Sequence, residues 1–289
     1  MASEPDYIIW HIDESEEELR AGLLHPEYFA EKVHGLKPGS RRMMEVLATR
    51  RALKVLFDGE EQRVRYDEHG RPYLDARFTM HDARCTMHDA RCTMHDARCT
   101  MHNAGLNVSD DGSDNRALCI VNRASESVNR ASESVNREPN HCISISHTRD
   151  YAAVIRSDVP VGIDIERREQ RVQRVVSHFL KHEEVARLEL EASMANAGHD
   201  GSHSASTTGD NDCDTVYALL LHLAWSAKEA AFKVLGQAYY DLMNLTTVNR
   251  VNWQDRTLTL EVEGRGLPLL IHFDYTDDYV LAWVQNEYN

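Results

Sequence analysis

Two acidic side chains stand two residues apart in the segment VGIDIE, residues 161–166. Alternate residues of a β-strand share a face, so Asp164 and Glu166 project together while the isoleucines beside them turn toward the core. Two carboxylates this close repel each other unless a cation joins them, and their oxygens suit the hard ion Mg²⁺. The alternative is a solvated strand face on which both acids pair with Arg167 or Arg168.

The segment WSAKEAAFKVLG, residues 225–236, has the periodicity of an amphipathic helix. Because each residue advances the helix by about 100°, Lys228 falls on the apolar face with Trp225 and Phe232. A cation removed from water is costly unless a negative group meets it. The spacing therefore predicts a carboxylate or a phosphate as the partner of Lys228.

Glu229 supplies a third carboxylate on the same helix, and Lys233 follows it at the i+4 position, close enough for contact. Two ordinary interpretations compete with a functional one. Ser226 and Glu229 fit the S-x-x-E capping box, and Glu229 with Lys233 fits an exposed ion pair. Neither of them explains the position of Lys228.

A row of polar side chains follows in HCISISH, residues 141–147, where Ser144 and Ser146 alternate with isoleucines and His147 ends the segment. Hydroxyl and imidazole groups at the end of a strand can donate hydrogen bonds to phosphate oxygens, although a single histidine is more often structural. A basic cluster lies nearer the N-terminus, and its alternative is a solvated helix face. Its members are Arg41, Arg42, Arg50 and Arg51.

The elements that must position these residues alternate between α and β patterns. Period-2 segments predict strands, and longer segments with a period near 3.6 predict helices. The predicted strands are 7–12, 141–147, 151–157, 161–166, 257–263, 267–273 and 278–284, and the predicted helices are 15–23, 40–57 and 225–236. The last three strands are typical of an antiparallel meander.

Repeated segments interrupt this pattern. TMHDARC occurs three times in residues 79–99 and VNRASES twice in residues 121–134, which is typical of recent duplication rather than of a solenoid. We therefore interpret 79–139 as an inserted loop between an N-terminal lobe, 1–78, and a C-terminal lobe, 140–289. Within the second lobe, 192–214 is rich in small polar residues and is expected to be a mobile loop.

Composition excludes some classes of protein. A net charge of −15 argues against a general nucleic-acid-binding protein, so an anionic ligand would need a local basic patch. The chain has no apolar run near the ~20 residues of a membrane span, and its first residues do not resemble a signal peptide. We expect a cytoplasmic protein.

The order and spacing of four motifs carry a family resemblance. VGIDIE is followed some sixty residues later by WSAKEAAFK, and both are preceded by GRPYL at 70–74 and ISISHT at 143–148. This set resembles the signature of the 4′-phosphopantetheinyl transferases, of the monomeric type that activates peptide synthetases and acyl carrier proteins. The resemblance covers roughly residues 36–78 and 140–289.

The resemblance implies an α+β fold of two pseudo-twofold-related lobes, each a small, mainly antiparallel sheet packed with a long helix, with coenzyme A in the cleft between them. Asp164, Glu166 and Glu229 would hold Mg²⁺, and Lys228 and Lys233 would face the pyrophosphate. The remaining contacts, to the nucleotide phosphates, would come from His147, Ser146, Arg71 and, for the 3′-phosphate, Arg42.

The reaction that the resemblance implies is transfer of 4′-phosphopantetheine from coenzyme A to a serine of an apo acyl or peptidyl carrier protein, with release of 3′,5′-ADP. Lys233 would stabilise the charge on the phosphates, and Glu229 would be either the general base or only a metal ligand. Two alternatives stay open: a coenzyme A-binding module without turnover, and a metal-dependent nucleotide phosphohydrolase.

Overall fold

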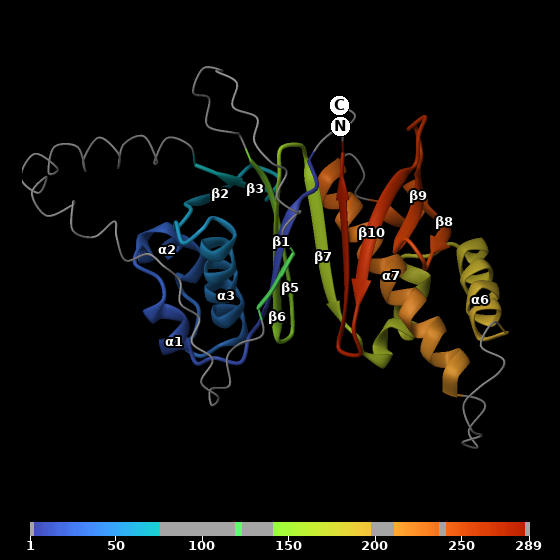
Figure 1. Ribbon diagram of the computed structural model, residues 1–289, viewed down its shortest axis with the longest axis horizontal. Helices are drawn as coiled ribbons and strands as arrows, with labels where there is room; N and C mark the ends of the chain where they lie inside the picture. The colour runs from blue at the N-terminus through green and yellow to red at the C-terminus, as the bar shows by residue number, and fades with distance from the viewer. Residues whose placement is uncertain (1–2, 76–118, 123–140, 198–210, 237–240, 287–289) are drawn as a thin grey trace, which may run out of the picture.

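The computed structural model describes residues 3–75, 119–122, 141–197, 211–236 and 241–286. They form two antiparallel sheets that lie between two groups of helices, and Figure 1 shows α1–α3 at one end of the molecule and α6 at the other. The predicted α+β fold with two lobes is therefore confirmed. None of the described helices is both long and apolar enough to cross a membrane.

Helices cover one side of the N-terminal lobe. They are α1 (Glu16–Ala21), the 3₁₀-helix η1 (Pro26–Tyr28), α2 (Ala30–Val33) and α3 (Arg41–Leu56). Ser15 caps α1 in a reciprocal capping box with Glu18, and the hydroxyl of Ser40 accepts from the Met43 N–H at the start of α3. These caps satisfy N–H groups that a helix start leaves unpaired, so both helices begin where their sequences predict.

The N-terminal sheet has the strand order β4-β1-β6-β5, with β1 (Asp6–His11), β4 (Cys119–Asn122), β5 (Cys142–Thr148) and β6 (Tyr151–Ser157). A short hairpin of β2 (Val64–Tyr66) and β3 (Pro72–Leu74) stands apart from it. On β1, Ile8 and Trp10 pack in the core with α3, whereas Tyr7 and Ile9 face the second sheet. Both faces of the sheet are thus covered.

The C-terminal sheet has the order β7-β11-β10-β9-β8. Its strands are β7 (Val161–Arg167), β8 (Thr246–Asn252), β9 (Thr257–Val262), β10 (Leu269–Tyr275) and β11 (Tyr279–Gln285). Its helices are η2 (Gln170–His178), α6 (His182–Ala197), α7 (Asn211–Leu235) and α8 (Leu242–Leu245). Leu220, Ala224 and Ala231 of α7 are fully buried in the core that this helix forms with the sheet.

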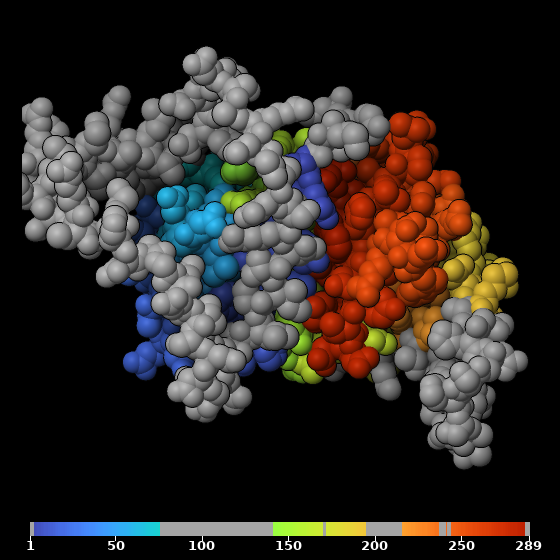
Figure 2. All heavy atoms as spheres, in the orientation of Figure 1, coloured from blue at the N-terminus to red at the C-terminus, as the bar shows by residue number. Residues whose placement is uncertain are grey.

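The two sheets pack against each other through a separate apolar cluster. Tyr7 and Ile9 from β1 meet Ile163 from β7 and Leu281 from β11, and the rings of Tyr7 and Trp283 lie 5.0 Å apart. Figure 2 shows the C-terminal strands, in orange and red, directly beside the blue N-terminal segment. Burial of this cluster holds the lobes together, since apolar area removed from water stabilises the contact.

Three boundaries differ from the sequence analysis. Strand β6 pairs with β1 and β5 pairs with β6, so the N-terminal sheet extends past residue 140 and the second sheet begins with β7. Within the predicted inserted loop, Cys119–Asn122 pair with β1, while the copied heptads lie largely outside the described residues. The loop predicted at 192–214 is shorter, because α6 continues to Ala197 and α7 begins at Asn211.

Candidate active site

Strands β5 and β7 meet along a seam of polar contacts between the lobes. The hydroxyl of Ser144 accepts from the Ile163 N–H at 3.2 Å, and the hydroxyl of Ser146 donates to Oδ1 of Asp164 at 2.8 Å. At the end of the seam, Oγ1 of Thr148 lies 3.5 Å from Oε2 of Glu166. As strand alternation predicts, Asp164 and Glu166 project from the same face of β7.

Gly162 brings β7 directly against α7. A Cβ atom on this residue would lie 2.0 Å from the carbonyl oxygen of Ala230, so only glycine permits this approach. The close packing lets Nζ of Lys233 donate to the Ile163 carbonyl at 2.7 Å and to Oδ1 of Asp164 at 2.9 Å. The glycine of the GID motif thus joins the acid of the strand to the lysine of the helix.

Three carboxylates interact at this junction. Burial, and next the charge of Asp164, raise the pKa of Glu166 to about 7, although Nε1 of Trp225 donates to this carboxylate at 3.1 Å. Burial and Asp164 also raise the pKa of Glu229, and Lys233 opposes them. The folded chain disfavours the ionised form of Glu166. The free energy of unfolding therefore falls as pH rises from 4.5, the ordinary pKa of this carboxyl group, through about 7.

The cluster fits a hard divalent cation that is completed by a ligand. Oδ2 of Asp164 is buried and has no hydrogen-bond partner in the described part of the chain. Among the described residues, no group of three or more His, Cys, Asp or Glu side chains is arranged so that it could hold a metal ion by itself. Protein sites for Mg²⁺ commonly supply one or two carboxylates and take their other oxygens from substrate phosphates and water, which suits this geometry.

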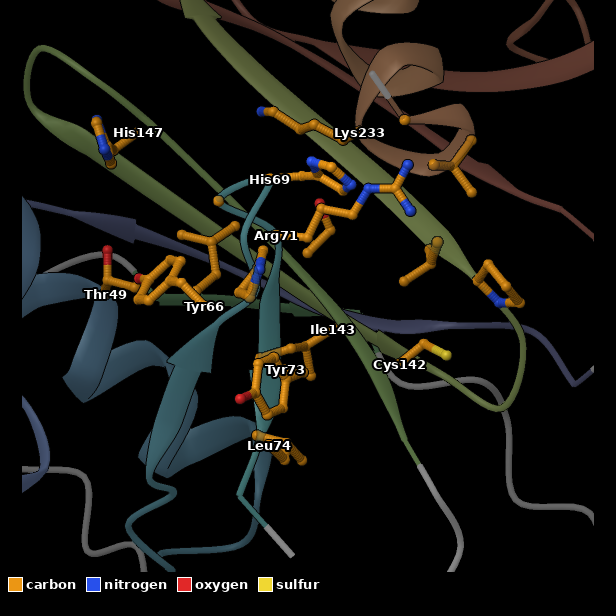
Figure 3. Close-up of a pocket in the computed structure, with 18 of the residues that line it drawn as sticks. Thr49, Tyr66, His69, Arg71, Tyr73, Leu74, Cys142, Ile143, His147 and Lys233 are labelled. Atoms are coloured by element: carbon orange, nitrogen blue, oxygen red, sulfur yellow. The ribbon is translucent and has the colours of Figure 1, made fainter. Parts of the chain in front are cut away.

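A cavity of about 550 Å³ lies beside the cluster, within the usual range for small-molecule sites. Every charged residue that lines its described wall is cationic or can become so, in a chain whose net charge is −15. They are Lys32, Arg42, Arg50, His69, Arg71, His141, His147 and Lys233. In Figure 3, Lys233 from α7, His147 from β5 and Arg71 from the β2–β3 hairpin surround this space.

The structure brings distant predicted residues together here. Arg42 on α3 contacts the ring nitrogen Nε2 of His147, 105 residues later in the chain. Arg71 lies against Gly236 just after α7, at a position where a Cβ atom would collide with its guanidinium. Gly236 has a φ of +92°, which favours glycine on its own account. Arg42, Arg71, His147 and Lys233 therefore line one cavity.

Arg50 is a cavity residue that the sequence placed only in a basic cluster, with a solvated helix face as the alternative. Arg50 is only 5% exposed. Within the described chain, its Nε and Nη1 atoms are buried and have no hydrogen-bond partner. Burial lowers its pKa, and Tyr66 acts in the opposite direction. The sequence signal that could have identified Arg50 was its spacing of eight residues, just over two helical turns, from Arg42.

Lys228 does not line this cavity, so the prediction that it contacts the pyrophosphate is wrong. The residue is fully buried, and Nζ donates to Glu184 at 3.0 Å and to the carbonyls of Phe179 and Thr246 at 2.8 and 3.2 Å. An ammonium group has three donors, so none is left for a phosphate. Of the two partners predicted for Lys228, a carboxylate and a phosphate, the structure has the carboxylate. Burial lowers the pKa of Lys228, and Glu184 opposes this effect.

The structure also decides between the interpretations of the other polar residues. Ser146 is buried and donates to Asp164, so its hydroxyl supports the acid rather than lining the cavity. Asp164 is only 4% exposed, which excludes a solvated strand face. Arg167 pairs instead with Asp150. Ser226 lies inside α7, far from its first residue, so the capping-box interpretation is wrong.

A second cavity of about 690 Å³ adjoins Glu166. Val172, Phe179 and Trp225 give it an apolar wall, and Arg41 and Arg167 are among the basic residues around it. Glu166 thus borders the partly apolar cavity, whereas Lys233 lines the basic one.

Comparison with known proteins agrees with the arrangement of the C-terminal lobe. A family model described as the 4′-phosphopantetheinyl transferase superfamily matches residues 160–284, from the start of β7 to the end of β11. This range contains the GID glycine, the three carboxylates and Lys233. No curated protein matched the chain. Over residues 160–284, less than half of its length, the chain is therefore similar to the 4′-phosphopantetheinyl transferase superfamily.

Proposed function

We propose that this protein transfers the 4′-phosphopantetheine group of coenzyme A to a serine of an apo acyl or peptidyl carrier protein, with Mg²⁺ bound at the carboxylate cluster. The observation that carries the proposal is a cavity whose charged lining residues are all basic and include Lys233, which contacts Asp164. Coenzyme A bears a 3′-phosphate and a pyrophosphate, and such a ligand needs several cations around it.

The cavity residues have separate tasks in this proposal. Arg42, Arg50 and His147 are placed to bind the 3′-phosphate end, because they line the N-terminal side of the cavity. Arg71 and Lys233 are placed to bind the pyrophosphate near the acid cluster. The apolar second cavity beside Glu166 gives the pantetheine arm and the incoming serine a path to the same phosphorus.

The proposed reaction is a displacement at the β-phosphorus. The serine oxygen forms a bond to this phosphorus, the phosphoanhydride bond to the α-phosphate breaks, and 3′,5′-ADP leaves. Glu229 accepts the serine proton, directly or through water, and its raised pKa suits this role. Lys233 donates to the α-phosphate and stabilises the charge that collects on the leaving group.

Asp164, Glu166 and Glu229 are the residues that would hold the magnesium ion, with Oδ2 of Asp164 as the free oxygen. When bound, the ion neutralises negative charge on the phosphate oxygens and withdraws electrons from phosphorus. Ser146 and Trp225 keep the carboxylates of Asp164 and Glu166 in place through their hydrogen bonds. Lys233 shares Asp164 with the ion and keeps the cluster from carrying three unopposed charges.

The full chain, incubated with coenzyme A, Mg²⁺ and a set of apo carrier proteins, is expected to add the mass of one phosphopantetheine group to a carrier serine. Intact-protein mass spectrometry measures the gain, and EDTA in place of Mg²⁺ should abolish it. Binding of coenzyme A without any mass gain would favour a binding module. Release of 3′,5′-ADP without a carrier would favour a phosphohydrolase.

Arg50→Met is expected to weaken coenzyme A binding by about tenfold to a hundredfold, because a hydrogen bond to a charged group contributes roughly 1.5–3 kcal/mol. The substitution also removes a buried charge with two unpartnered nitrogens, so the free energy of unfolding should stay constant or rise. Isothermal titration calorimetry and urea denaturation measure the two effects.

Arg51→Met is the matched control, since Arg51 is the next residue of α3 and points elsewhere. Its guanidinium lies 5.5 Å from the Trp10 ring centre and fills the space beside Gly22. This substitution should cost stability and leave the affinity for coenzyme A unchanged. If Arg50→Met binds coenzyme A as tightly as the unaltered protein, Arg50 has no part in the ligand site.

A further inference from the structure

Glu45 on α3 is a carboxylate that lies behind the basic cavity rather than in its wall. Its side chain is 7% exposed, and it accepts hydrogen bonds from Nε of Arg41 at 2.7 Å and Nη1 of Arg42 at 3.3 Å. Oε2 of the same carboxylate lies 3.2 Å from Nδ1 of His147. One buried acid therefore connects two arginines of a helix with the histidine at the end of β5.

The contacts of His147 assign its tautomer. Nη1 of Arg42 contacts Nε2 of the ring, and a guanidinium can only donate, so Nε2 is the acceptor. The ring proton consequently sits on Nδ1, which lies 3.2 Å from Oε2 of Glu45. In this arrangement Arg42 occupies Nε2 and Glu45 lies beside Nδ1.

We infer that Glu45 is a positioning residue that holds Arg42 and His147 ready for a phosphate and allows His147 to take up a proton when the phosphate binds. The inference rests on the proposed function, because coenzyme A supplies the phosphate. Once a phosphate oxygen replaces Nε2 as the acceptor of Arg42, Nε2 is free to bind a proton and donate to the phosphate. Glu45 then neutralises the imidazolium from behind.

The surrounding charges determine the sign of the pH effect. Burial lowers the pKa of His147, Glu45 raises it, and Arg42 and Lys233 lower it again. Besides these groups from α3 and α7, His69 and Arg71 of the hairpin line the same cavity. A bound phosphate adds negative charge beside the ring and raises its pKa. Binding therefore takes up a proton, and affinity falls as pH rises between the free and bound pKa values.

The test is calorimetric titration of the full chain with coenzyme A in two buffers that differ in protonation enthalpy. The unaltered protein should show proton uptake near pH 7 and an affinity that falls by up to about tenfold per pH unit. Glu45→Gln keeps the size and one acceptor but removes the charge, so it should lose this uptake and show a flatter pH profile. Any proton released by the phosphate itself is common to both proteins.

Glu61→Gln is the matched control, because Glu61 is a similarly buried side chain, 6% exposed, that pairs with Lys54 away from the cavity. It should alter stability and leave proton uptake unchanged. His147→Gln provides a second variant, which should lose the uptake as Glu45→Gln does. Coenzyme A binding with equal proton uptake in all four proteins overturns the inference, whereas failure of the unaltered protein to bind coenzyme A overturns the proposed function instead.

Discussion

Asp164→Asn is expected to slow phosphopantetheine transfer by about 10²- to 10³-fold, the loss of several kcal/mol of charge stabilisation at phosphorus. Asp164 is the residue on which the site converges, because its Oδ1 already accepts from Ser146 and Lys233 and its Oδ2 is left free. An amide of the same shape retains one acceptor oxygen but carries no charge. Transfer rates at saturating coenzyme A and carrier, measured over a range of Mg²⁺ concentrations, give the size of the effect.

The same substitution has a second readout that does not depend on turnover. Asp164 is the largest electrostatic cause of the raised pKa of Glu166, which is about 7. In Asp164→Asn this pKa should fall but stay above its ordinary value of 4.5, because burial, the larger cause, is unchanged; carboxyl-carbon NMR during a pH titration follows it. The destabilisation that ionised Glu166 causes would shrink accordingly.

Asp255→Asn is the control for both measurements, since Asp255 is an exposed aspartate in the turn between β8 and β9 and lines neither cavity. It should change neither the transfer rate nor the pKa of Glu166. A fall in transfer of less than about threefold in Asp164→Asn would argue against a magnesium ion held by this carboxylate.

Local sequence patterns predicted the parts of the site that depend on local geometry. Alternation along β7 is a property of any strand, so the shared face of Asp164 and Glu166 followed from their spacing alone. Helical periodicity likewise placed Lys228 on the buried face of α7. The family resemblance implied that Arg42, Arg71, His147 and Lys233 lie around one ligand, which no local pattern indicates.

Partners that are distant in sequence were not predictable in the same way. Lys228 needed a negative partner, but nothing in its own segment indicated Glu184, 44 residues earlier on α6. Ser146 was expected to face a phosphate, and only the register of β5 against β7 reveals Asp164 as its acceptor. Arg50 and Arg51 are neighbours of the same type, and the fold of the β2–β3 hairpin over α3 decides which one lies in the cavity.

Strand order was also beyond the reach of periodicity. The segments of β5 and β6 have the pattern of strands, but the pattern does not reveal that β6 pairs with β1, some 145 residues earlier in the chain. Tyr7 and Ile9 alternate with Ile8 and Trp10, so β1 has two apolar faces and needs a layer on each side. Such a strand indicates a central position in the fold but does not identify its neighbours.

Lys228→Met is expected to lower the free energy of unfolding by about 3–5 kcal/mol, because it leaves Glu184 as an unpaired charge in the core. Both side chains are fully buried, and their closest oxygen and nitrogen atoms are 2.9 Å apart. Glu184 also accepts from the backbone N–H groups of Lys181 and Val248, so it links the start of α6 to β8 as well as to α7. Urea denaturation followed by tryptophan fluorescence measures the change.

Two further proteins decide whether this loss comes from the pair or from packing. Glu184→Gln combined with Lys228→Met removes both charges and should recover part of the stability, since glutamine still accepts one backbone hydrogen bond. Lys181→Met removes a half-buried lysine that donates to the Thr247 hydroxyl at 2.9 Å, and it should cost about 1 kcal/mol or less. If Lys228 faced the pyrophosphate instead, Lys228→Met would retain its stability and lose affinity for coenzyme A. The saturated contacts of its ammonium group lead us to expect the reverse: a large loss of stability, with any loss of binding following from displacement of the adjacent Glu229.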